Sequence, residues 1–380
     1  MDKSLLNKKP VKILILYSDT GGGHRSAMEA IVEALKMDLG DRVAIEEVDL
    51  FKEYSPPPLN RAAEMYPRMV RLPQAWGLMY HLSDGRRRSR LITASTWPYV
   101  RRSIRKLVRQ HPSDLIVSVH PFANEPVLRA LGPNRPPFIT VVTDLVTTHA
   151  FWYHRRTDLC IVPTRAAGKR ALEMGLHPDQ LEVIGLPVAQ RFCQPSGDRQ
   201  ALRARLGWPQ DLPMTLMVGG GEGMGPLEKI VEAINKAQLP TGLAIVAGRN
   251  LALKERLESR EWPLPTFVYG FVREMPDFMQ AADILVTKAG PGTISEAFLA
   301  ELPIILYSRL PGQEDGNVQY VVSKGAGMWA PRPAAIVEAL RCLLNEDDRR
   351  TTMALASASL ARPDAARQIA KRLAERAGVS

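Results

Sequence analysis

Residues 11–37 read VKILILYSDTGGGHRSAMEAIVEALKM, and this stretch decides the fold class. Val11–Tyr17 is a short apolar run of the kind that forms a buried strand, and it passes directly into a glycine-rich turn. An amphipathic stretch from Ala27 to Met37 follows and predicts a helix. A strand, a glycine-rich turn and a helix in this order are the start of a βαβ unit.

Outward from this stretch, short apolar runs alternate with amphipathic stretches over nearly the whole chain. This alternation is typical of α/β proteins with a mainly parallel sheet. Strand candidates in the first half are Val11–Tyr17, Val43–Val48, Asp114–Val119, Phe138–Thr143, Asp158–Val162 and Leu181–Ile184. Those in the second half are Pro213–Val218, Leu243–Ala247, Pro265–Tyr269, Ile284–Thr287 and Pro303–Tyr307. The sequence therefore predicts an α/β fold with two doubly wound, Rossmann-like domains.

The length of 380 residues agrees with two domains of about 100 to 200 residues each. The pattern breaks at residues 187–200, PVAQRFCQPSGDRQ, where Pro, Ser, Gly and Asp cluster without periodicity. We therefore expect an N-terminal domain over residues 1–195 and a C-terminal domain over residues 196–380, facing each other across a cleft for two substrates. The last helices, from Pro333 to about Gly378, could pack back onto the first domain.

Composition excludes several classes of protein. Hydrophobic residues make up 45% and charged residues 24%, as in an ordinary globular chain. No apolar run approaches the roughly 18 to 20 residues that cross a bilayer, so we expect neither a membrane-spanning nor a secreted protein. The three cysteines, an odd number without metal-ligand spacing, argue against a disulfide framework and a zinc site, and they predict a reducing cytoplasm.

The first chemical motif is the loop Ser18–Ser26, between the first strand and its helix. Gly22 and Gly23 let the backbone approach a ligand closely, and the helix N-terminus offers unpaired N–H groups to an anion. His24 at this N-terminus is expected to stay neutral and to accept a proton near pH 7. The alternative without a chemical role is a surface histidine that caps the helix. A dinucleotide fingerprint is not favoured, because Ser26 stands where that pattern needs Gly or Ala.

The second motif is a glycine loop between a strand and a helix that Pro226 opens. Five of the seven residues from Gly219 to Gly225 are glycine, which costs more chain entropy than turning the chain requires. An anion-binding loop is therefore favoured over a loose strand–helix turn.

The third motif is TKAGPGTISEA, residues 287–297, followed by PGQEDGN at residues 311–317. Lys288 at a strand end and a helix start near Pro291 place positive potential at one point, where a diphosphate would fit. Glu296, further along this helix, could accept two hydrogen bonds from a ribose diol. Side chains that could reach sugar hydroxyls from the next loop are Gln313, Glu314 and Asn317. The alternative is that these residues are helix caps and a solvated helix face.

These motifs resemble one glycosyltransferase group. Residues 14–35 (LILYSDTGGGHRSAMEAIVEAL), 244–250 (AIVAGRN) and the motifs within residues 270–322 are similar to monogalactosyldiacylglycerol synthases and bacterial diacylglycerol glucosyltransferases of glycosyltransferase family 28. A more distant resemblance is to the enzyme that adds N-acetylglucosamine to lipid I. The resemblance covers most of the chain and implies a GT-B fold, with a lipid-acceptor and membrane-binding domain first and a UDP-sugar domain second.

The resemblance also implies the donor site. The diphosphate would lie on the two glycine-rich loops, the uridine beside the AGRN segment, the ribose on Glu296 and the sugar on the PGQEDGN loop. The implied donor-binding residues are Gly219, Gly220, Gly221, Gly223, Gly248, Arg249, Phe271, Lys288, Gly290, Gly292, Thr293, Glu296, Gln313, Glu314 and Asn317.

Inverting transfer, which the resemblance implies, needs one base to deprotonate the acceptor hydroxyl. His24 matches the histidine of the family's glycine loop, and Asp144 and His120, which follow strand-like runs, could share the role. A helix cap and a turn residue are the alternatives for the latter two. No D-x-D sequence occurs in the chain, so Lys288, Arg249 and helix N-termini are expected to neutralise the leaving diphosphate without a metal ion or another cofactor.

Basic charge is concentrated in one stretch. The formal net charge is +10, and residues 84–110 hold nine Lys or Arg against one Asp. Aromatic residues, Tyr80 among them, are interspersed along the longer stretch Phe51–Gln110. Such residues favour the water–lipid boundary, so this stretch predicts peripheral binding to anionic membrane lipids. The expected residues on the acceptor and membrane side are Gly22, Gly23, Trp76, Arg86, Arg87, Arg88 and Trp97. Core aromatics and a solvated arginine face are the alternative, and no nucleic acid is expected, because no recognised nucleic-acid motif accompanies the charge.

We therefore predict a UDP-sugar-dependent enzyme, cytoplasmic and peripheral on the membrane, that adds a hexose to 1,2-diacylglycerol and makes a β-glycoside. Overall likeness favours galactose over glucose as the transferred sugar. The alternatives are transfer of N-acetylglucosamine to a polyprenyl-linked lipid, and an inactive protein that binds UDP-sugar or lipid. The sequence carries no signal for the oligomeric state.

Overall fold

The computed structural model of the chain describes residues 9–20, 22–69, 72–194 and 197–379. The chain divides into two compact units. The first comprises the described residues of Met1–Gln190, together with Pro311–Gln313 and Asp364–Ser380. The second comprises the described residues of Arg191–Leu310 and Glu314–Pro363.

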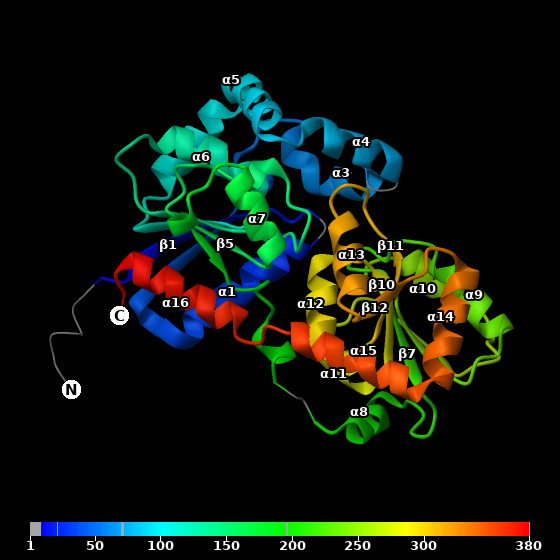
Figure 1. The fold of residues 1–380 in the computed structure, drawn as a ribbon. Helices are drawn as coiled ribbons and strands as arrows, with labels where there is room; N and C mark the ends of the chain where they lie inside the picture. Colours follow the sequence, from blue (N-terminus) through cyan, green and yellow to red (C-terminus); the bar gives the residue numbers. More distant parts are fainter. Residues whose placement is uncertain (1–8, 21, 70–71, 195–196, 380) are drawn as a thin grey trace, which may run out of the picture. The chain divides into compact units, whose positions relative to one another are not determined.

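The first unit is built on a parallel sheet with the strand order β2-β1-β3-β4-β5-β6. Its strands are β1 (Val11–Tyr17), β2 (Val43–Asp49), β3 (Leu115–Ser118), β4 (Phe138–Val141), β5 (Leu159–Val162) and β6 (Leu181–Val183). Its helices are α1 (Gly23–Leu39), α2 (Leu50–Tyr54), α3 (Ala62–Met69), α4 (Pro73–Ser83), α5 (Arg86–Gln110), α6 (Asn124–Leu131), α7 (Arg165–Glu173) and α16 (Ala365–Ala377). Figure 1 labels most of these elements.

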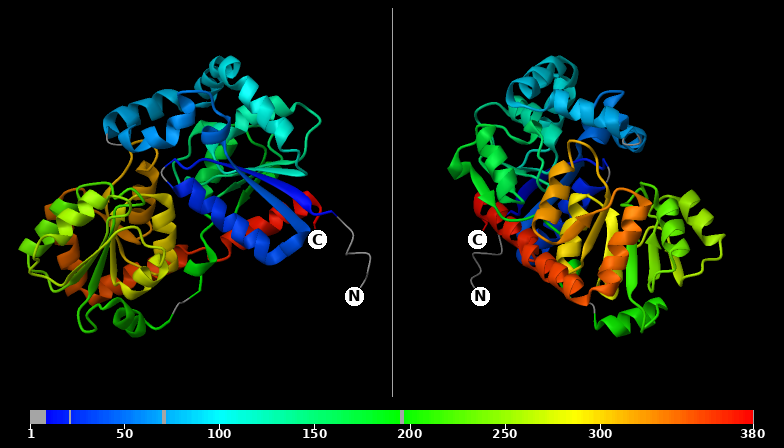
Figure 2. Two further views of the ribbon diagram at one scale, coloured as in Figure 1. Left: turned by 180° about the vertical axis from the view of Figure 1, so that it is seen from behind. Right: turned by 45° about the vertical axis from the view of Figure 1, so that its right-hand side comes forward.

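Both faces of this sheet are covered by helices, which explains why the inner strands β3, β4 and β5 are buried along their whole length. Side chains of β1 alternate between the faces. Ile13 and Ile15 pack in the core beneath α1 and α16, and these two helices lie side by side (Figures 1 and 2). Leu14 and Leu16 pack in a second core with α5 and α6. The carboxyl ends of all six strands meet at one edge, because the strands are parallel.

The second unit has a parallel sheet with the strand order β12-β11-β10-β7-β8-β9. Its strands are β7 (Met214–Val218), β8 (Gly242–Val246), β9 (Thr266–Tyr269), β10 (Ile284–Lys288), β11 (Ile304–Ser308) and β12 (Gly327–Trp329). Its helices are α8 (Arg199–Leu206), α9 (Leu227–Lys236), α10 (Leu251–Glu258), α11 (Met275–Ala281), α12 (Pro291–Leu299), α13 (Asp315–Ser323), α14 (Pro333–Asn345) and α15 (Asp347–Leu360).

The predicted α/β class with two parallel sheets is confirmed. Every strand candidate corresponds to a strand, with ends that differ by at most two residues. The sequence missed β12, because three residues that begin with glycine give too short a signal for a periodicity argument. Helix α1 begins at Gly23, four residues before the expected start at Ala27, so His24 lies in its first turn. Along the part of the chain that the structure describes, no helix combines the length and the apolar character that crossing a membrane would require.

Candidate active site

His24 is positioned by the turn between β1 and α1. Gly22 caps α1 with a φ of 78°, in the left-handed region that glycine adopts at least cost. In the first turn of the helix, Nδ1 of His24 lies 2.6 Å from the hydroxyl of Thr143, which is 3% exposed. When Nδ1 carries the proton and donates to Thr143, Nε2 is the basic nitrogen. No other hydrogen bond of the His24 ring is found among the described residues.

A second histidine lies against the first. The ring centroids of His24 and His120 are 4.7 Å apart in an edge-to-face arrangement. His120 is buried, its Nδ1 accepts from the N–H of Phe122 at 3.4 Å, and its Nε2 lies 3.4 Å from the hydroxyl of Thr20. Burial lowers the pKa of His24, against an opposing effect of Asp144, and burial followed by His24 lowers the pKa of His120 well below its ordinary value. Both rings are therefore neutral near pH 7 and can accept a proton.

Asp144 is held from two sides. Its Oδ2 accepts from the indole N–H of Trp152 at 2.6 Å, and its Oδ1 accepts from the side-chain amide of Gln313 at 3.1 Å, both within the first unit. The ring of Trp152 lies 5.8 Å from that of His24. The structure thus places all three base candidates in one group, beyond the ends of β1, β3 and β4.

The glycine loop after β7 belongs to the second unit. A Cβ at Gly223 would collide with the carbonyl oxygen of Ala247, and Gly223 and Gly248 both have positive φ. The N–H of Arg249 donates to the carbonyl of Gly221 at 2.8 Å. These contacts require glycine for close approach of two backbones, so the loop is a defined structure rather than a loose turn.

Arg249 is anchored at the rim of this loop. Its guanidinium lies 2.7 Å from the Glu222 carboxylate and 5.2 Å from the centroid of the Phe271 ring. Phe271 is 58% exposed, so its ring offers an open face to a planar base. The predicted pair of Arg249 and Phe271 is therefore brought together, and Glu222 joins it.

The third motif surrounds the end of β10. The ammonium group of Lys288 lies 2.9 Å from Oε1 of Glu314, and Oε2 of Glu314 accepts from the N–H of Leu310 at 2.8 Å. Asn317 donates from Nδ2 to the carbonyl of Ala289 at 2.9 Å, and its buried Oδ1 has no partner among the described residues. Both oxygens of the Glu314 carboxylate are therefore occupied within the protein.

Helix α12 begins at Pro291, with Gly290 at its N-cap, and Gly292 and Thr293 lie in its first turn. A Cβ at Gly292 would meet nothing within 4 Å, so this turn is open to a ligand. Glu296 is partly buried, and burial raises its pKa to about 7, with Arg191 acting in the opposite direction. A carboxylate so poorly solvated gains from donors such as the hydroxyls of a diol.

The predicted membrane residues lie on α4 and α5. Arg87 and Arg88 are exposed and Arg86 is partly exposed, near the start of α5. Trp97 packs against the core of the first unit beneath the guanidinium of Arg129, 4.7 Å from its ring centroid. Trp76 is partly buried, with its ring 5.7 Å from that of Tyr66. Both tryptophans are therefore only partly exposed.

Comparison with known proteins matches the two halves of the chain to two family descriptions. Residues 24–188 match the family described as monogalactosyldiacylglycerol (MGDG) synthase, and residues 214–369 match the glycosyltransferase family 28 C-terminal domain. A probable monogalactosyldiacylglycerol synthase, chloroplastic, of Nicotiana tabacum is 38% identical over 376 residues, which cover 96% of this chain and 70% of that protein.

This chain belongs to the monogalactosyldiacylglycerol synthase family. It is a UDP-sugar glycosyltransferase.

Solved structures agree on the architecture of this MGDG synthase-family protein. MurG of Acinetobacter baumannii aligns over 96% of this chain and all of its own (100%), with a TM-score of 0.61 and 14% identity. CalG4, the calicheamicin glycosyltransferase, aligns over 97% of this chain and 99% of its own, with a TM-score of 0.61 and 16% identity. At such identities the likeness shows the fold alone, and that fold is GT-B, as expected.

Several residues of the site were missed in the sequence. Thr143 immediately precedes Asp144, and a polar residue at a strand end was the signal that could have found it. No sequence pattern connects Trp152 with Asp144. Glu222 was missed because it stands out only as an interruption of the glycine run. Tyr307 donates its hydroxyl hydrogen to the carbonyl of Met224 at 2.9 Å and so fixes the glycine loop from β11. Apart from Asp144 and Trp152, which are 8 positions apart, these contacts join residues at least 27 positions apart in this MGDG synthase-family protein, so spacing alone does not reveal them.

Proposed function

We propose that this protein transfers galactose from UDP-galactose to the free hydroxyl of 1,2-diacylglycerol with inversion, and makes a β-monogalactosyldiacylglycerol at a membrane surface. The names of its relatives support galactose and this acceptor. The single observation that carries the chemistry is the arrangement of His24, whose Nδ1 is held by Thr143 at 2.6 Å while Nε2 remains available.

In the proposed step, the acceptor hydroxyl oxygen forms a bond to the anomeric carbon as the bond from that carbon to the diphosphate oxygen breaks. The hydroxyl proton passes to Nε2 of His24, and UDP leaves with the bonding electron pair. Displacement from the face opposite the leaving group inverts the anomeric centre. The carboxylate of Asp144 stabilises the charge of the imidazolium that forms, since its effect opposes the lowering of the His24 pKa by burial. His120, which is buried and neutral, excludes water from one side of the ring.

Donor binding would use the second unit. The diphosphate would accept from backbone N–H groups of the glycine loop and of α12, with Lys288 and Arg249 supplying positive charge. Arg249 and Phe271 would frame the uracil ring, and the ribose hydroxyls would donate to Glu296. Glu314 would position Lys288, because both of its carboxylate oxygens are already occupied.

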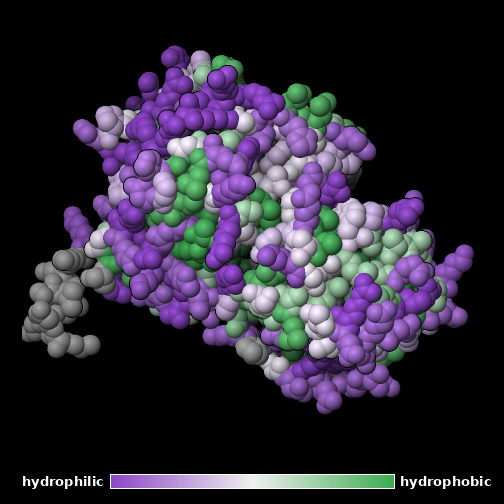
Figure 3. All heavy atoms as spheres, in the orientation of Figure 1, coloured by the Kyte–Doolittle hydropathy of each residue, from purple (hydrophilic) through white to green (hydrophobic). Residues whose placement is uncertain are grey.

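Attachment to the membrane would use the helices between β2 and α6. Hydrophobic atoms reach the surface over α4, whereas the surface over α5 is mostly hydrophilic (Figure 3). Among the described residues of α3, α4 and the turn between them, the large apolar side chains that are exposed are Met65, Met69, Leu72, Leu78, Met79 and Leu82. Such a group of apolar side chains beside a basic helix is suited to a bilayer with anionic headgroups.

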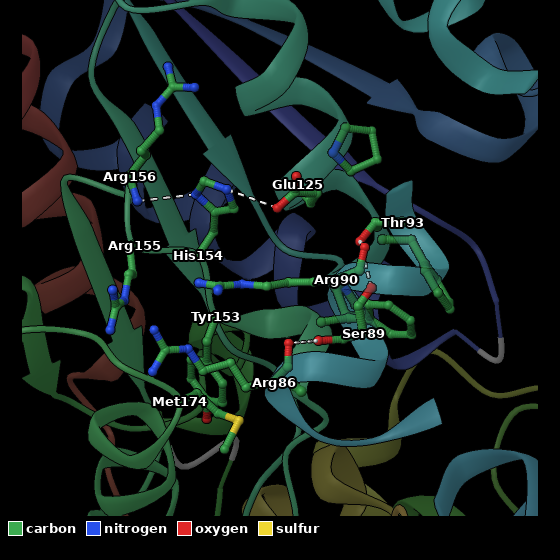
Figure 4. A pocket seen from close by; sticks show the side chains of 15 residues that line it. Arg86, Ser89, Arg90, Thr93, Glu125, Tyr153, His154, Arg155, Arg156 and Met174 are labelled. Atoms are coloured by element: carbon green, nitrogen blue, oxygen red, sulfur yellow. Dashed lines mark hydrogen bonds and ion pairs between the residues drawn. The ribbon is translucent and has the colours of Figure 1, made fainter. Parts of the chain in front are cut away.

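A basic pocket supports the anionic lipid partner. It encloses about 260 Å³ and is lined by α5 and by the loops that hold His120 and Trp152 (Figure 4). Arg90 reaches across it toward His154 (Figure 4). Within the described part of the chain, the side chains of Arg86 and Arg90 make no hydrogen bond or ion pair, and Glu125 is engaged by His154 at 2.9 Å. The uncompensated guanidinium groups would attract a phosphate headgroup.

The proposed activity is tested by incubating the full chain with radiolabelled UDP-galactose or UDP-glucose and vesicles that contain diacylglycerol and phosphatidylglycerol. We expect a galactolipid whose anomeric proton shows the large coupling of a β-glycoside, and no product from His24→Asn, a variant that is expected to bind UDP normally. Exclusive use of UDP-glucose would contradict the donor, an α-product would contradict inversion, and full activity of the variant would contradict the base.

A further inference from the structure

Tyr80 on α4 has a buried phenol that no protein group satisfies. The residue is 9% exposed, and its hydroxyl has no hydrogen-bond partner among the described residues. Its ring meets that of His149 edge-to-face, with centroids 4.9 Å apart. A Cβ at Gly312 would lie 2.6 Å from Cδ1 of Tyr80, so the ring packs directly on the backbone beside Gln313. Although Tyr80 belongs to the aromatic stretch predicted to lie at the membrane, it faces the interior of the first unit.

A second unsatisfied polar atom belongs to Gln313, the residue that follows Gly312. The side-chain amide of Gln313 donates from Nε2 to Asp144, but its buried Oε1 has no partner in the described residues. Asp144 also acts on the phenol, because burial, followed by the carboxylates of Asp144 and Asp84, raises the pKa of Tyr80 far above its ordinary value. The phenol therefore remains an O–H donor, and Oε1 of Gln313 remains a hydrogen-bond acceptor.

We propose that Tyr80 and Gln313 form a binding site for an alcohol hydroxyl beside Asp144. The phenol donates its hydrogen to the ligand oxygen, and the ligand hydroxyl donates its own hydrogen to Oε1 of Gln313. An alcohol supplies both a donor and an acceptor, and it matches these two groups one to one.

Other ligand classes fit this place poorly. The carboxylates of Asp144 and Asp84, both of which act on the phenol, would repel an anion. An apolar group would leave the phenol and the amide oxygen buried without partners, which is unfavourable. A hydroxyl group of a hexose or of a glycerol backbone is therefore the ligand chemistry that the site would recognise.

This inference rests on the proposed function, because that function supplies two substrates with hydroxyl groups. The site lies beside Asp144, whose charge acts on the pKa of His24, and a hydroxyl of either substrate would be held there during transfer. Tyr80 would be a specificity residue rather than a base, since it binds a hydroxyl that does not react.

The test is Tyr80→Phe, which removes only the hydroxyl, beside Tyr99→Phe on the exposed surface of α5 as a matched control. We expect kcat/KM of Tyr80→Phe to fall about tenfold or more, because a buried group of the substrate loses its partner. A rise in the KM for UDP-galactose, with UDP affinity unchanged in calorimetry, assigns the site to the hexose. A rise in the KM for diacylglycerol assigns it to the glycerol. Unchanged values for both substrates would overturn the proposal.

Further measurements distinguish a ligand-binding role of Tyr80 from a structural role, and a failure of this proposal from a failure of the proposed function. Tm of Tyr80→Phe should equal or exceed that of the parent, because the variant no longer buries an unpaired hydroxyl, and a lower Tm would contradict the proposal. Gln313→Leu combined with Tyr80→Phe should lose little more than either change alone, and additive losses would show that the two groups do not share one ligand. If the parent protein forms no glycolipid, the proposed function is refuted. The effect of Tyr80→Phe on the binding of UDP-galactose, measured by calorimetry, is a separate result and does not change that conclusion.

Discussion

The ammonium group of Lys288 lies 2.9 Å from the carboxylate of Glu314, and the two side chains are only 17% and 4% exposed. A Cβ on Gly290 would lie 2.8 Å from this ammonium group, so the glycine gives the lysine room at the end of β10. Glu314 thus fixes the cation in the loop where a diphosphate was predicted. The sequence predicts that Glu314 binds the sugar. Both of its carboxylate oxygens are engaged within the protein, and we propose that it positions Lys288.

Lys288→Met should weaken UDP binding and also destabilise the protein. The variant leaves Glu314 buried without its cation, which should lower the free energy of unfolding by about 3 kcal/mol. Adding Glu314→Gln should restore much of the stability but not the UDP affinity. Urea unfolding and calorimetry would measure the two effects. Equal stability of the single and double variants would contradict the pairing.

Glu296→Ala should weaken UDP binding by about 2 kcal/mol, roughly 30-fold, because two ribose hydroxyls would lose their acceptor. Calorimetry with UDP and with UMP would measure this loss, which should be similar for both ligands since both carry the ribose. A folded variant with the affinity of the parent would refute the assignment of Glu296 to the ribose.

The raised pKa of Glu296 predicts opposite pH dependences for binding and stability. The group has a folded-state pKa of about 7 against an ordinary value of 4.5, so its contribution to the free energy of unfolding falls as pH rises from 4.5 through 7. Binding of a diol needs the carboxylate, so UDP affinity should increase over the upper part of that interval. Glu296→Gln should flatten both profiles, and a parent-like slope in that variant would assign the titration to another group.

Activity should survive removal of divalent metal ions. The charge on the leaving diphosphate is expected to be met by Lys288, Arg249 and backbone N–H groups. Dialysis against EDTA followed by a turnover assay checks this expectation. If turnover disappears and returns on addition of magnesium or manganese, a metal ion takes part in the reaction.

Reversal of the basic residues at the start of α5 should detach the protein from anionic vesicles. Replacing Arg86, Arg87 and Arg88 with Glu removes three positive charges and adds three negative ones, at about 1 kcal/mol of attraction for each basic residue lost. UDP affinity should not change, since the residues proposed to bind UDP, such as Lys288, Arg249 and Glu296, belong to the other unit.

The matched control for this variant reverses Arg101, Arg102 and Arg105, which are exposed further along the same helix. Vesicle co-sedimentation with and without phosphatidylglycerol, at low and high salt, compares the two variants. Equal sedimentation of the first variant and the parent would assign its arginines to another role, and equal losses in both variants would show that total charge rather than position matters.

The sequence by itself determined the class of fold and the loops that carry chemistry. Apolar runs such as Val11–Tyr17 are local signals, because a strand covered on both faces must be apolar along its whole length. Glycine at Gly22 and Gly223 is likewise a local signal, since each backbone angle there is one that other residues rarely adopt. For the same reason the resemblance could be read from a few contiguous motifs.

Only the tertiary structure decided which side chains of those loops meet. Thr143 lies 119 positions from the histidine that it holds, and Glu314 lies 26 positions from Lys288. Such pairings arise because parallel strands bring their carboxyl ends to one edge, whatever their separation in the chain. Tyr80 is a further example. The sequence places this aromatic residue in the stretch predicted to bind the membrane, and only its neighbours in the structure show that it is buried. Burial and hydrogen bonding of a side chain depend on packing, which a local pattern does not encode.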